Sequence, residues 1–465
     1  MKNKTKIVLI VLTLAIVLLA ISCNQQKEVI VSFDERIELL CCIGILTPNG
    51  GSHQAKFVHP IRKSALEYFE PYKNHKAVNI AEEILNHLFL DSFPAIALSF
   101  NNISELNVRM FPPYVCKEIE AGYGNIDVLW DFAKAVKDFY QETSFEKFWE
   151  NHSDEYKRTS ERFREEISQI PLRKTIEDYF GISKPEFMFN IYISFLTPAG
   201  FMFGSPEFEE VKIKYSVTSP WPVPPDSASY DHISGKDLIS GAIHEFGHSF
   251  INPVTAKFQD EVAKRAWLFE VLNKNDMMTN LHYGRWEGCL NENIVRAATA
   301  RLNKYVSGEK PTEKWEGRNT YPFLLIPFIY EKLVEYEDNR SKFPTYESFF
   351  PNIISMLDSL EAFEEIILDF SFNIYEKEGK FYINWISYGS SAQNAGLLVD
   401  DKIKKVGKET IESVSEFNKI RQEIMKGRWG RDINIIIERA GKERTIPIVL
   451  NESKVIRLRR KTKDN

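Results

Sequence analysis

The chain has few cysteines, little net charge and only one long apolar run. Its five cysteines include no Cys-x-x-Cys pair, so the sequence predicts neither a cysteine-rich metal site nor a disulfide framework. The net charge of −6 over 465 residues is mild, and we therefore expect no nucleic-acid partner. A hydrophobic content of 43% still permits a large core, and the length is sufficient for two or three domains.

The long apolar run covers residues 7–21 and follows a lysine-rich start, which is the pattern of a signal peptide. It is too short to span a membrane comfortably. The run ends in Leu-Ala-Ile-Ser-Cys23 and resembles a bacterial lipobox, although Ala20 stands where leucine is usual. The resemblance implies removal of residues 1–22, lipidation of Cys23, and an exported protein anchored to the outer membrane or at the periplasmic face. An ordinary secretory signal or an uncleaved anchor is the alternative.

A metal-binding motif lies on a predicted helix that begins after a Ser234 N-cap and ends at Pro253. The motif is His-Glu-x-x-His. His244 and His248 are four residues apart, so they share one face of the helix and can bind one metal ion. Glu245 can act as general base on a water molecule at that ion. The alternative is a helix face whose histidines and glutamate are satisfied by hydrogen bonds.

A catalytic zinc site usually has three protein ligands and one open position, so a third ligand is expected. The His-x-x-Gly-x-x-His continuation typical of metzincins is absent after His248. Glu292 lies on a second helical stretch, directly after Asn291. Here the chain resembles the gluzincin metallopeptidases, whose second helix carries an Asn-Glu pair that supplies the third ligand. The resemblance implies a peptidase whose Zn²⁺ is held by His244, His248 and Glu292.

Two neighbours of this third ligand leave questions open. Glu287 is a competing ligand one helical turn earlier. Arg296 stands where many relatives carry an acidic residue that orients a histidine, so the support of the ligands must be built differently. The body of the chain, about residues 28–360, also resembles a family of exported bacterial proteins of uncharacterised function with gluzincin-type motifs.

Hydrogen-bond donors for the oxyanion of a tetrahedral intermediate are also needed in such chemistry. Four side chains could serve, and the sequence does not choose among them: Tyr330, Tyr321, His282 and Tyr283.

Most of residues 23–365 is predicted to be helical, with a small sheet, as expected for a zincin-like domain. Residues 187–196 are expected to form an edge strand above the metal, to which a substrate backbone could add. Residues 221–225 are expected to form an irregular connector, and residues 254–282 are expected to be mostly helical and to bridge the two helices that carry the ligands. A helix over residues 321–336 is expected to kink at Pro327.

After about residue 365 the pattern becomes that of strands, with a helix over residues 414–425. Residues 389–407 resemble the PDZ domains of bacterial periplasmic proteases, and the resemblance extends over residues 366–452. It implies a groove for a peptide ligand. Two features depart from the pattern: Asp400 replaces a usual glycine, and the expected carboxylate-binding loop at residues 364–369 contains no glycine. The basic tail, residues 453–465, is predicted to be disordered.

The sequence thus predicts an α+β protein that hydrolyses polypeptide substrates in the cell envelope with Zn²⁺, and whose PDZ-like domain binds substrate or a partner. The main rival is a non-catalytic envelope adaptor with a structural metal site. A second rival is a hydrolase that acts on cell-wall peptides or on another amide.

Overall fold

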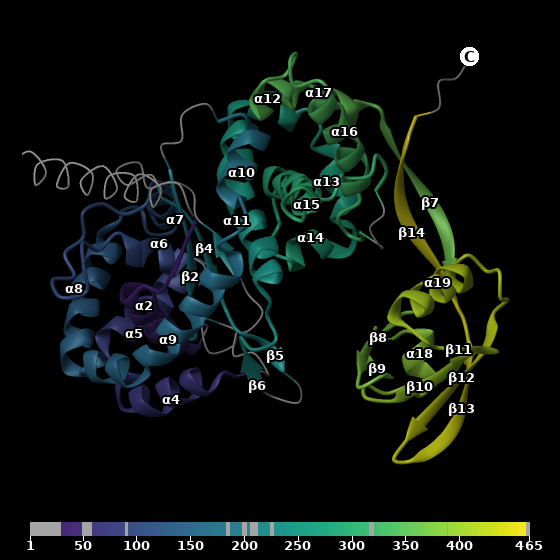
Figure 1. The fold of residues 1–465 in the computed structure, drawn as a ribbon, viewed down its shortest axis with the longest axis horizontal. Coiled ribbons are helices and arrows are strands. Elements are labelled where there is room, and N and C mark those ends of the chain that lie inside the picture. Colours follow the sequence, from purple (N-terminus) through teal and green to yellow (C-terminus); the bar gives the residue numbers. More distant parts are fainter. Residues whose placement is uncertain are drawn as a thin grey trace, which may run out of the picture. The chain divides into compact units, whose positions relative to one another are not determined.

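A computed structural model describes residues 29–48, 58–88, 92–182, 187–197, 202–204, 213–223, 227–315, 320–387 and 389–461. The signal peptide and Cys23 lie outside these residues. The chain divides into two compact units between Asp358 and Ser359, and helices and sheets together confirm the α+β prediction (Figure 1). No helix within the described ranges is long and apolar enough to cross a membrane.

The first unit contains a four-stranded sheet in the order β1-β2-β4-β3. Strands β1 (Val29–Ser32), β2 (Met188–Ile193) and β4 (Ile213–Thr218) are parallel, and β3 (Met202–Gly204) runs antiparallel to β4. The prediction that residues 187–196 form the edge is wrong, because β2 pairs on both sides. Its last five residues are all buried, as expected for an interior parallel strand. The edge beside β4 is β3.

Helices before and between the strands build the first part of this unit, in agreement with the helical prediction. They are α2 (Glu35–Ile45), α4 (Pro60–Phe69), the 3-10 turn Glu70–Tyr72, α5 (Lys76–Leu85), α6 (Ser92–Leu98), α7 (Pro113–Tyr123), α8 (Asp127–Glu142), α9 (Phe145–Ile167) and α10 (Leu172–Phe180). Aromatic rings of α4, α8 and α9 pack together at Phe69, Phe139 and Phe145 and are fully buried. This aromatic stripe therefore belongs to the core.

A buried carboxyl group joins α2 to α9 and to the end of β2. Glu38 is 1% exposed and accepts hydrogen bonds from the hydroxyl of Tyr156 and from the backbone N–H groups of Phe195 and Leu196, the latter two at 3.3 and 3.2 Å. Burial raises the pKa of Glu38 to about 7, against the hydrogen bonds that lower it. The side chain therefore titrates near neutral pH.

The second part of the unit consists of a hairpin and a set of helices. The elements are β5 (Trp221–Val223), β6 (Ser227–Ser229), α11 (Gly235–Lys257), α12 (Gln259–Ala263), α13 (Trp267–Leu272), the 3-10 turn Lys274–Asp276, α14 (Met277–Asn280), α15 (Trp286–Val306), α16 (Ile326–Asp338) and α17 (Tyr346–Asp358). The helical structure between α11 and α15 was predicted. Residues 221–223, predicted as an irregular connector, are a strand paired with β6. Pro327 does not kink α16; it lies in the first turn, where its missing N–H costs nothing.

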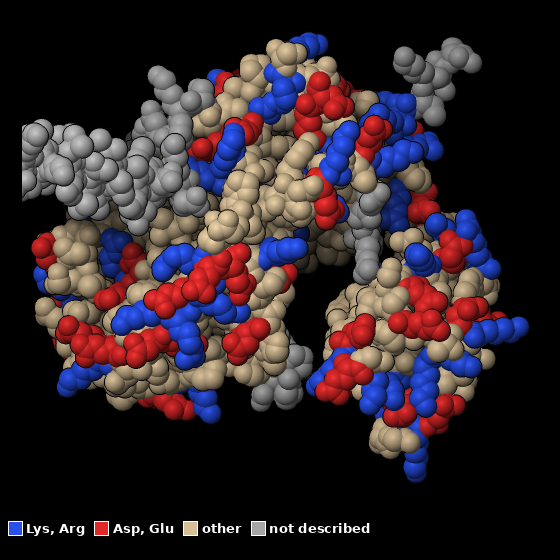
Figure 2. All heavy atoms as spheres, viewed as in Figure 1, with Lys and Arg blue, Asp and Glu red and all other residues tan. Residues whose placement is uncertain are grey.

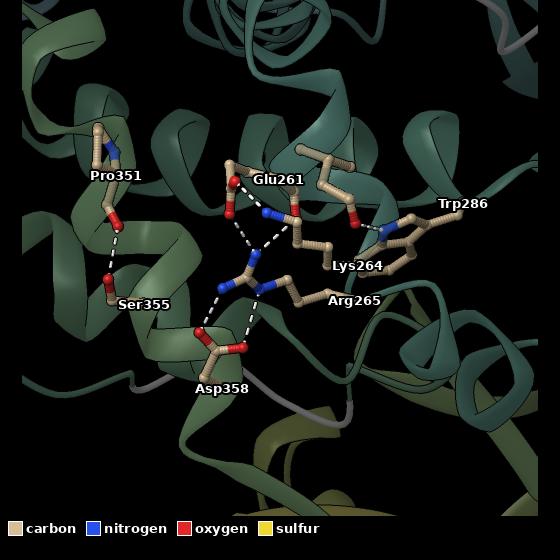
Figure 3. A network of polar contacts seen from close by, with 8 residues as sticks. Glu261, Lys264, Arg265, Trp286, Pro351, Ser355 and Asp358 are labelled. Carbon is tan, nitrogen blue, oxygen red and sulfur yellow. Dashed lines mark hydrogen bonds and ion pairs between the residues drawn. The ribbon is translucent and has the colours of Figure 1, made fainter.

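A polar network fixes the start of α15 (Figure 3). Arg265 forms a bidentate contact with Asp358 at the end of α17, at 2.9 and 2.5 Å, and also pairs with Glu261 of α12 at 2.9 Å. One turn away, the indole N–H of Trp286 donates to the Val262 carbonyl at 2.8 Å. These contacts tie α12 to both α15 and α17, and so set where α15 begins.

The second unit is built on a sheet in the order β13-β12-β10-β9-β8. Its elements are β7 (Leu360–Leu368), β8 (Phe372–Lys377), β9 (Lys380–Ile386), α18 (Ser391–Asn394), β10 (Lys402–Val406), β11 (Glu409–Thr410), α19 (Val414–Met425), β12 (Asp432–Arg439), β13 (Lys442–Val449) and β14 (Glu452–Arg460). The predicted helix over residues 414–425 and the two strands after it are confirmed. Asp400 has a φ of +70°, which explains why glycine is usual at this position.

The basic tail is ordered as β14, which pairs antiparallel with β7 over the full length of both strands. The prediction of disorder is therefore wrong as far as Arg460, and residues 364–368 are a strand instead of a carboxylate-binding loop. Opposite charges face each other across the pair: Lys454–Glu364 at 3.4 Å, Arg457–Glu365 at 3.0 Å and Arg459–Glu361 at 2.6 Å. Figure 2 shows acidic and basic side chains interspersed over the described residues of the visible face, as the mild net charge predicts.

Candidate metal centre

Helix α11 begins after the Ser234 N-cap that the sequence predicts, and the structure shows that Asp237 extends this cap to a capping box. The Ser234 hydroxyl accepts a hydrogen bond from the Asp237 N–H at 3.3 Å, and the Asp237 carboxylate accepts from the Ser234 N–H at 3.0 Å. The acidic side chain in the first turn also suits the positive end of the helix dipole. Local sequence is therefore sufficient to start the helix that carries both histidines.

The prediction that helix α11 ends at Pro253 is wrong, because the helix continues to Lys257. Proline has no N–H, so the carbonyl of Ser249 loses its helical partner. The ammonium group of Lys214, a buried residue of β4, donates to this carbonyl at 3.4 Å. The same group lies 4.3 Å from the ring centre of Phe187. A tertiary contact thus compensates for the bond that proline removes.

Helix α15 packs against α11 at the turn that holds the histidines. A β-carbon added at Gly247 would lie 3.4 Å from the Val295 side chain, an ordinary van der Waals contact, so the two helices lie close together at this turn. The packing brings Glu292, one turn before Val295, under the two rings. Glu292 is only 1% exposed, whereas the side chains of His244 and His248 are 21% and 25% exposed. The histidines therefore form the open side of the cluster.

The three predicted ligands meet. His244 Nε2 lies 3.6 Å from Glu292 Oε1, and His248 Nε2 lies 3.4 Å from Glu292 Oε2. One ligand atom from each residue falls within 4.8 Å of the others. Ligands about 2.0–2.2 Å from one tetrahedral zinc ion stand about 3.3–3.6 Å apart. The two contacts have this spacing but involve different oxygens of Glu292, so it is the donor set of two imidazoles and a carboxylate that suits zinc, and the cluster could hold a metal.

The oxygens of Glu292 differ in their contacts. Arg296 Nε lies 2.6 Å from Oε1, but its N–H does not point at that oxygen, and the buried Oε1 accepts no hydrogen bond. The contact is an ion pair that leaves the lone pairs of Oε1 available to a cation. The Arg296 guanidinium also lies 4.1 Å from the ring centre of Phe323. His248 is oriented by Asn252, with Nδ1 and Oδ1 3.3 Å apart. An amide thus supports His248, and an arginine is paired with Glu292.

The protonation states of Glu292 and His244 at neutral pH favour metal binding, whereas the raised pKa of His248 means that a cation must displace a proton there. Burial opposes ionisation of Glu292, but His248, His244 and Arg296 outweigh it and lower its pKa to about 2. Burial lowers the pKa of His244 to about 4, against the attraction of Glu292. For His248 burial acts the same way, but its hydrogen bond with Glu292 and the charge of Glu245 raise its pKa overall. A carboxylate and a neutral imidazole are the forms that bind a divalent cation.

The structure also places the other residues that the sequence proposed as general base, competing ligand or oxyanion donor. Glu245 is partly buried and close enough to act on the charge of His248. Glu287 is exposed in the first turn of α15 and is not a member of the metal-capable cluster. Tyr330 is buried against Arg301 and Trp315, with ring centres of Tyr330 and Trp315 5.1 Å apart. Tyr321 and His282 are both exposed.

Tyr283 is the aromatic residue that contacts the centre. Burial, then the charge of Glu292, raises its pKa well above the ordinary value, while Arg296 opposes this shift. Its ring centre lies 5.9 Å from that of Phe323. The hydroxyl is therefore protonated at neutral pH and can donate a hydrogen bond. The sequence offered Tyr283 only as one of four donors, because only the fold brings it to Glu292.

Residues 29–356 match the family described as Domain of unknown function (DUF4932). The chain belongs to this family. No curated protein matches it. Among solved structures, it is similar to an aminopeptidase N family protein from Idiomarina loihiensis, at 11% identity and a TM-score of 0.25. The match covers 64% of this chain and 64% of that chain, and a likeness this weak carries no argument about activity.

Proposed function

We propose that this DUF4932 protein is a zinc-dependent peptidase of the cell envelope. The observation that carries the proposal is the meeting of His244, His248 and Glu292 in one cluster that could hold a metal ion, with Glu245 next to His244 in the chain. The open side of the cluster, where the histidines are exposed, leaves room for water and substrate. A structural zinc site would instead need a fourth protein ligand, and the described residues supply three.

Zinc bound there would supply Lewis acidity toward a water molecule and the scissile carbonyl. Glu245 takes the proton from the attacking water and passes it to the leaving amine, which a carboxylate next to the metal is suited to do. Tyr283 donates a hydrogen bond to the oxyanion that develops on the carbonyl oxygen. Asn252 holds the imidazole of His248 through its other ring nitrogen, Nδ1, in the orientation that binding requires.

The second unit is proposed to be a PDZ-like module that binds an extended peptide of the substrate or of a partner. Strand β8 ends the described sheet, so its outer edge can add a further strand, and α19 packs beside it. The amino-terminal sequence supports export and a lipid anchor at Cys23. Together they would place a peptidase with its own peptide-binding module on a membrane surface.

The decisive experiment uses Glu245→Gln. We expect this variant to keep its metal, measured by elemental analysis, and to lose cleavage of a mixed peptide library. Glu287→Gln, with the same chemical change at an exposed site on α15, should keep both. Wild-type protein that binds zinc but cleaves no peptide or other amide would favour the envelope adaptor. Cleavage that survives Glu245→Gln would refute the proposed mechanism.

A further inference from the structure

We propose that Arg296 binds a carboxylate group of the substrate and so makes the enzyme select peptides with a carboxylate close to the scissile bond. This inference rests on the proposed peptidase function and concerns the same site. The carboxylate could be the carboxy terminus of a peptide or an acidic side chain. Both present the same planar, anionic group, which the guanidinium fork of arginine matches.

Arg296 is held at the centre on several sides. Its Nε lies 2.6 Å from Glu292 Oε1, the same oxygen that faces His244 Nε2 at 3.6 Å. The guanidinium lies over the ring of Phe323, with 4.1 Å between its central carbon and the ring centre. An arginine fixed in this way loses little side-chain entropy when it binds a ligand.

The fixed guanidinium still reaches solvent. The Arg296 side chain is 41% exposed, whereas that of Glu292, which it contacts, is 1% exposed. Nε is buried at Glu292, and the two terminal nitrogens extend beyond it along the side chain and form the fork that we propose binds the carboxylate. The imidazoles of His244 and His248 are also partly exposed. A substrate that reaches the metal through the open side of the cluster therefore meets this fork.

Charge favours the same substrate. The gluzincin resemblance leads one to expect an acidic residue at position 296. The charges of that residue, Glu245, Glu292 and a divalent cation would then sum to a negative value. Arginine at this position leaves the site net positive. A substrate carboxylate would be attracted to such a site and a free amino terminus would be repelled. If Arg296 served only to hold Glu292, its guanidinium would not raise kcat/KM for acidic substrates above that for neutral ones.

The test compares three versions of one cleaved peptide: a free carboxy terminus, a carboxamide, and a carboxamide with a glutamate beside the cleaved bond. We expect wild-type kcat/KM to be about 10–100-fold higher for one carboxylate version than for the neutral peptide, mainly through KM. The version preferred identifies the source of the carboxylate. In Arg296→Gln this ratio should fall toward one. Arg285→Gln removes the same charge from an exposed side chain at the start of α15 and should keep the ratio.

A second readout does not need turnover. Cobalt-loaded protein is titrated with succinate and, as the neutral control, with its diamide, while the visible absorption of the cobalt is followed. We expect succinate alone to change the spectrum, with a half-saturating concentration at least about tenfold higher in Arg296→Gln. Should Arg296→Gln lose its metal, Arg296→Lys takes its place, because it keeps the charge but lacks the planar fork.

The outcomes separate this inference from the function on which it rests. Peptides cleaved equally well with and without a carboxylate would overturn the role of Arg296 and leave the peptidase intact. A succinate response that depends on Arg296, in a protein that cleaves no peptide, would support the carboxylate site and refute the peptidase. A preference for carboxylates that is unchanged in the Arg296 variants would also refute the inference.

Discussion

Glu292 offers the sharpest test of the metal centre, because two substitutions remove different properties of its side chain. Glu292→Gln keeps the length and shape but removes the negative charge. Glu292→Asp keeps the charge but withdraws the carboxylate by about 1.5 Å, the length of one carbon–carbon bond. The Glu292 carboxylate lies 3.4 and 3.6 Å from the two imidazoles, so Glu292→Asp would draw it away from both rings, whereas Glu292→Gln would leave the group in place without its charge.

The expected loss of zinc affinity follows from these contacts. Substitution of a residue that only orients a ligand typically weakens metal binding about 10–100-fold. Loss of one of three ligands should cost more, and we expect more than about 100-fold for either variant, or about 2.8 kcal/mol or more. In Glu292→Gln the Arg296 charge would also lose its partner and repel the cation.

Zinc affinity is measured by competition with a chromophoric chelator at pH 7, and circular dichroism confirms that each variant is folded. Glu287→Gln is the matched control, because Glu287 lies on the same helix, is exposed, and is the ligand that the sequence could not exclude. We expect it to bind zinc like the wild type. The site assignment is refuted if Glu292→Gln binds zinc with unchanged affinity, or if Glu287→Gln is the variant that loses it.

Three further predictions concern catalysis and stability. Tyr283→Phe should lower kcat about 10²–10³-fold in a peptide assay and leave zinc content unchanged; unaltered kcat would exclude it as the oxyanion donor. Lys214→Met should lower the free energy of unfolding by about 1–3 kcal/mol, because the Ser249 carbonyl loses its donor, and adding Pro253→Ala should restore much of it in urea titrations. If Pro253→Ala gives no rescue, the Lys214 contact is not compensating for proline. Glu38 has a pKa of about 7 when folded and 4.5 as its ordinary value, so the folded state binds more protons and stability should fall by about 3 kcal/mol as pH rises from about 4.5 to 7. Glu38→Gln should flatten this pH dependence, and an unchanged slope would show that another group causes it.

Local sequence determined the start of α11 but not its end. The Ser234–Asp237 capping box lies within four consecutive residues, so its Ser234 N-cap could be predicted from the sequence. Continuation through Pro253 depends on Lys214, which reaches the helix from a strand earlier in the chain. A single lysine in a strand gives no signal of this role. The sequence-based prediction therefore failed where a tertiary contact overrides a local rule.

The second unit shows the same limit. The tail was predicted to be disordered because its basic residues repel one another when the segment is considered alone. Their partners are the acidic residues of β7, which lie about 90 positions earlier in the chain and were themselves read as a loop. Neither segment is a convincing strand without the other. Asp400 is a contrasting case. The sequence already showed that it replaces a usual glycine, and the structure shows that its backbone is in the left-handed conformation.

In the candidate metal centre, residue type and spacing predicted the two histidines, and the resemblance of Asn291-Glu292 to the gluzincin pair indicated the third side chain. The surroundings were not predictable, because they depend on how α11 and α15 pack. That packing places Asn252 next to His248, and it places Tyr283 and Arg296 next to Glu292. The side chain of Arg296 stays partly exposed. These residues would determine which substrate is preferred and how fast it is cleaved, whereas the metal ligands would determine the type of reaction. Specificity in this protein should therefore respond to substitutions at Arg296 and Tyr283 more than to any change in the motif that first reveals the site.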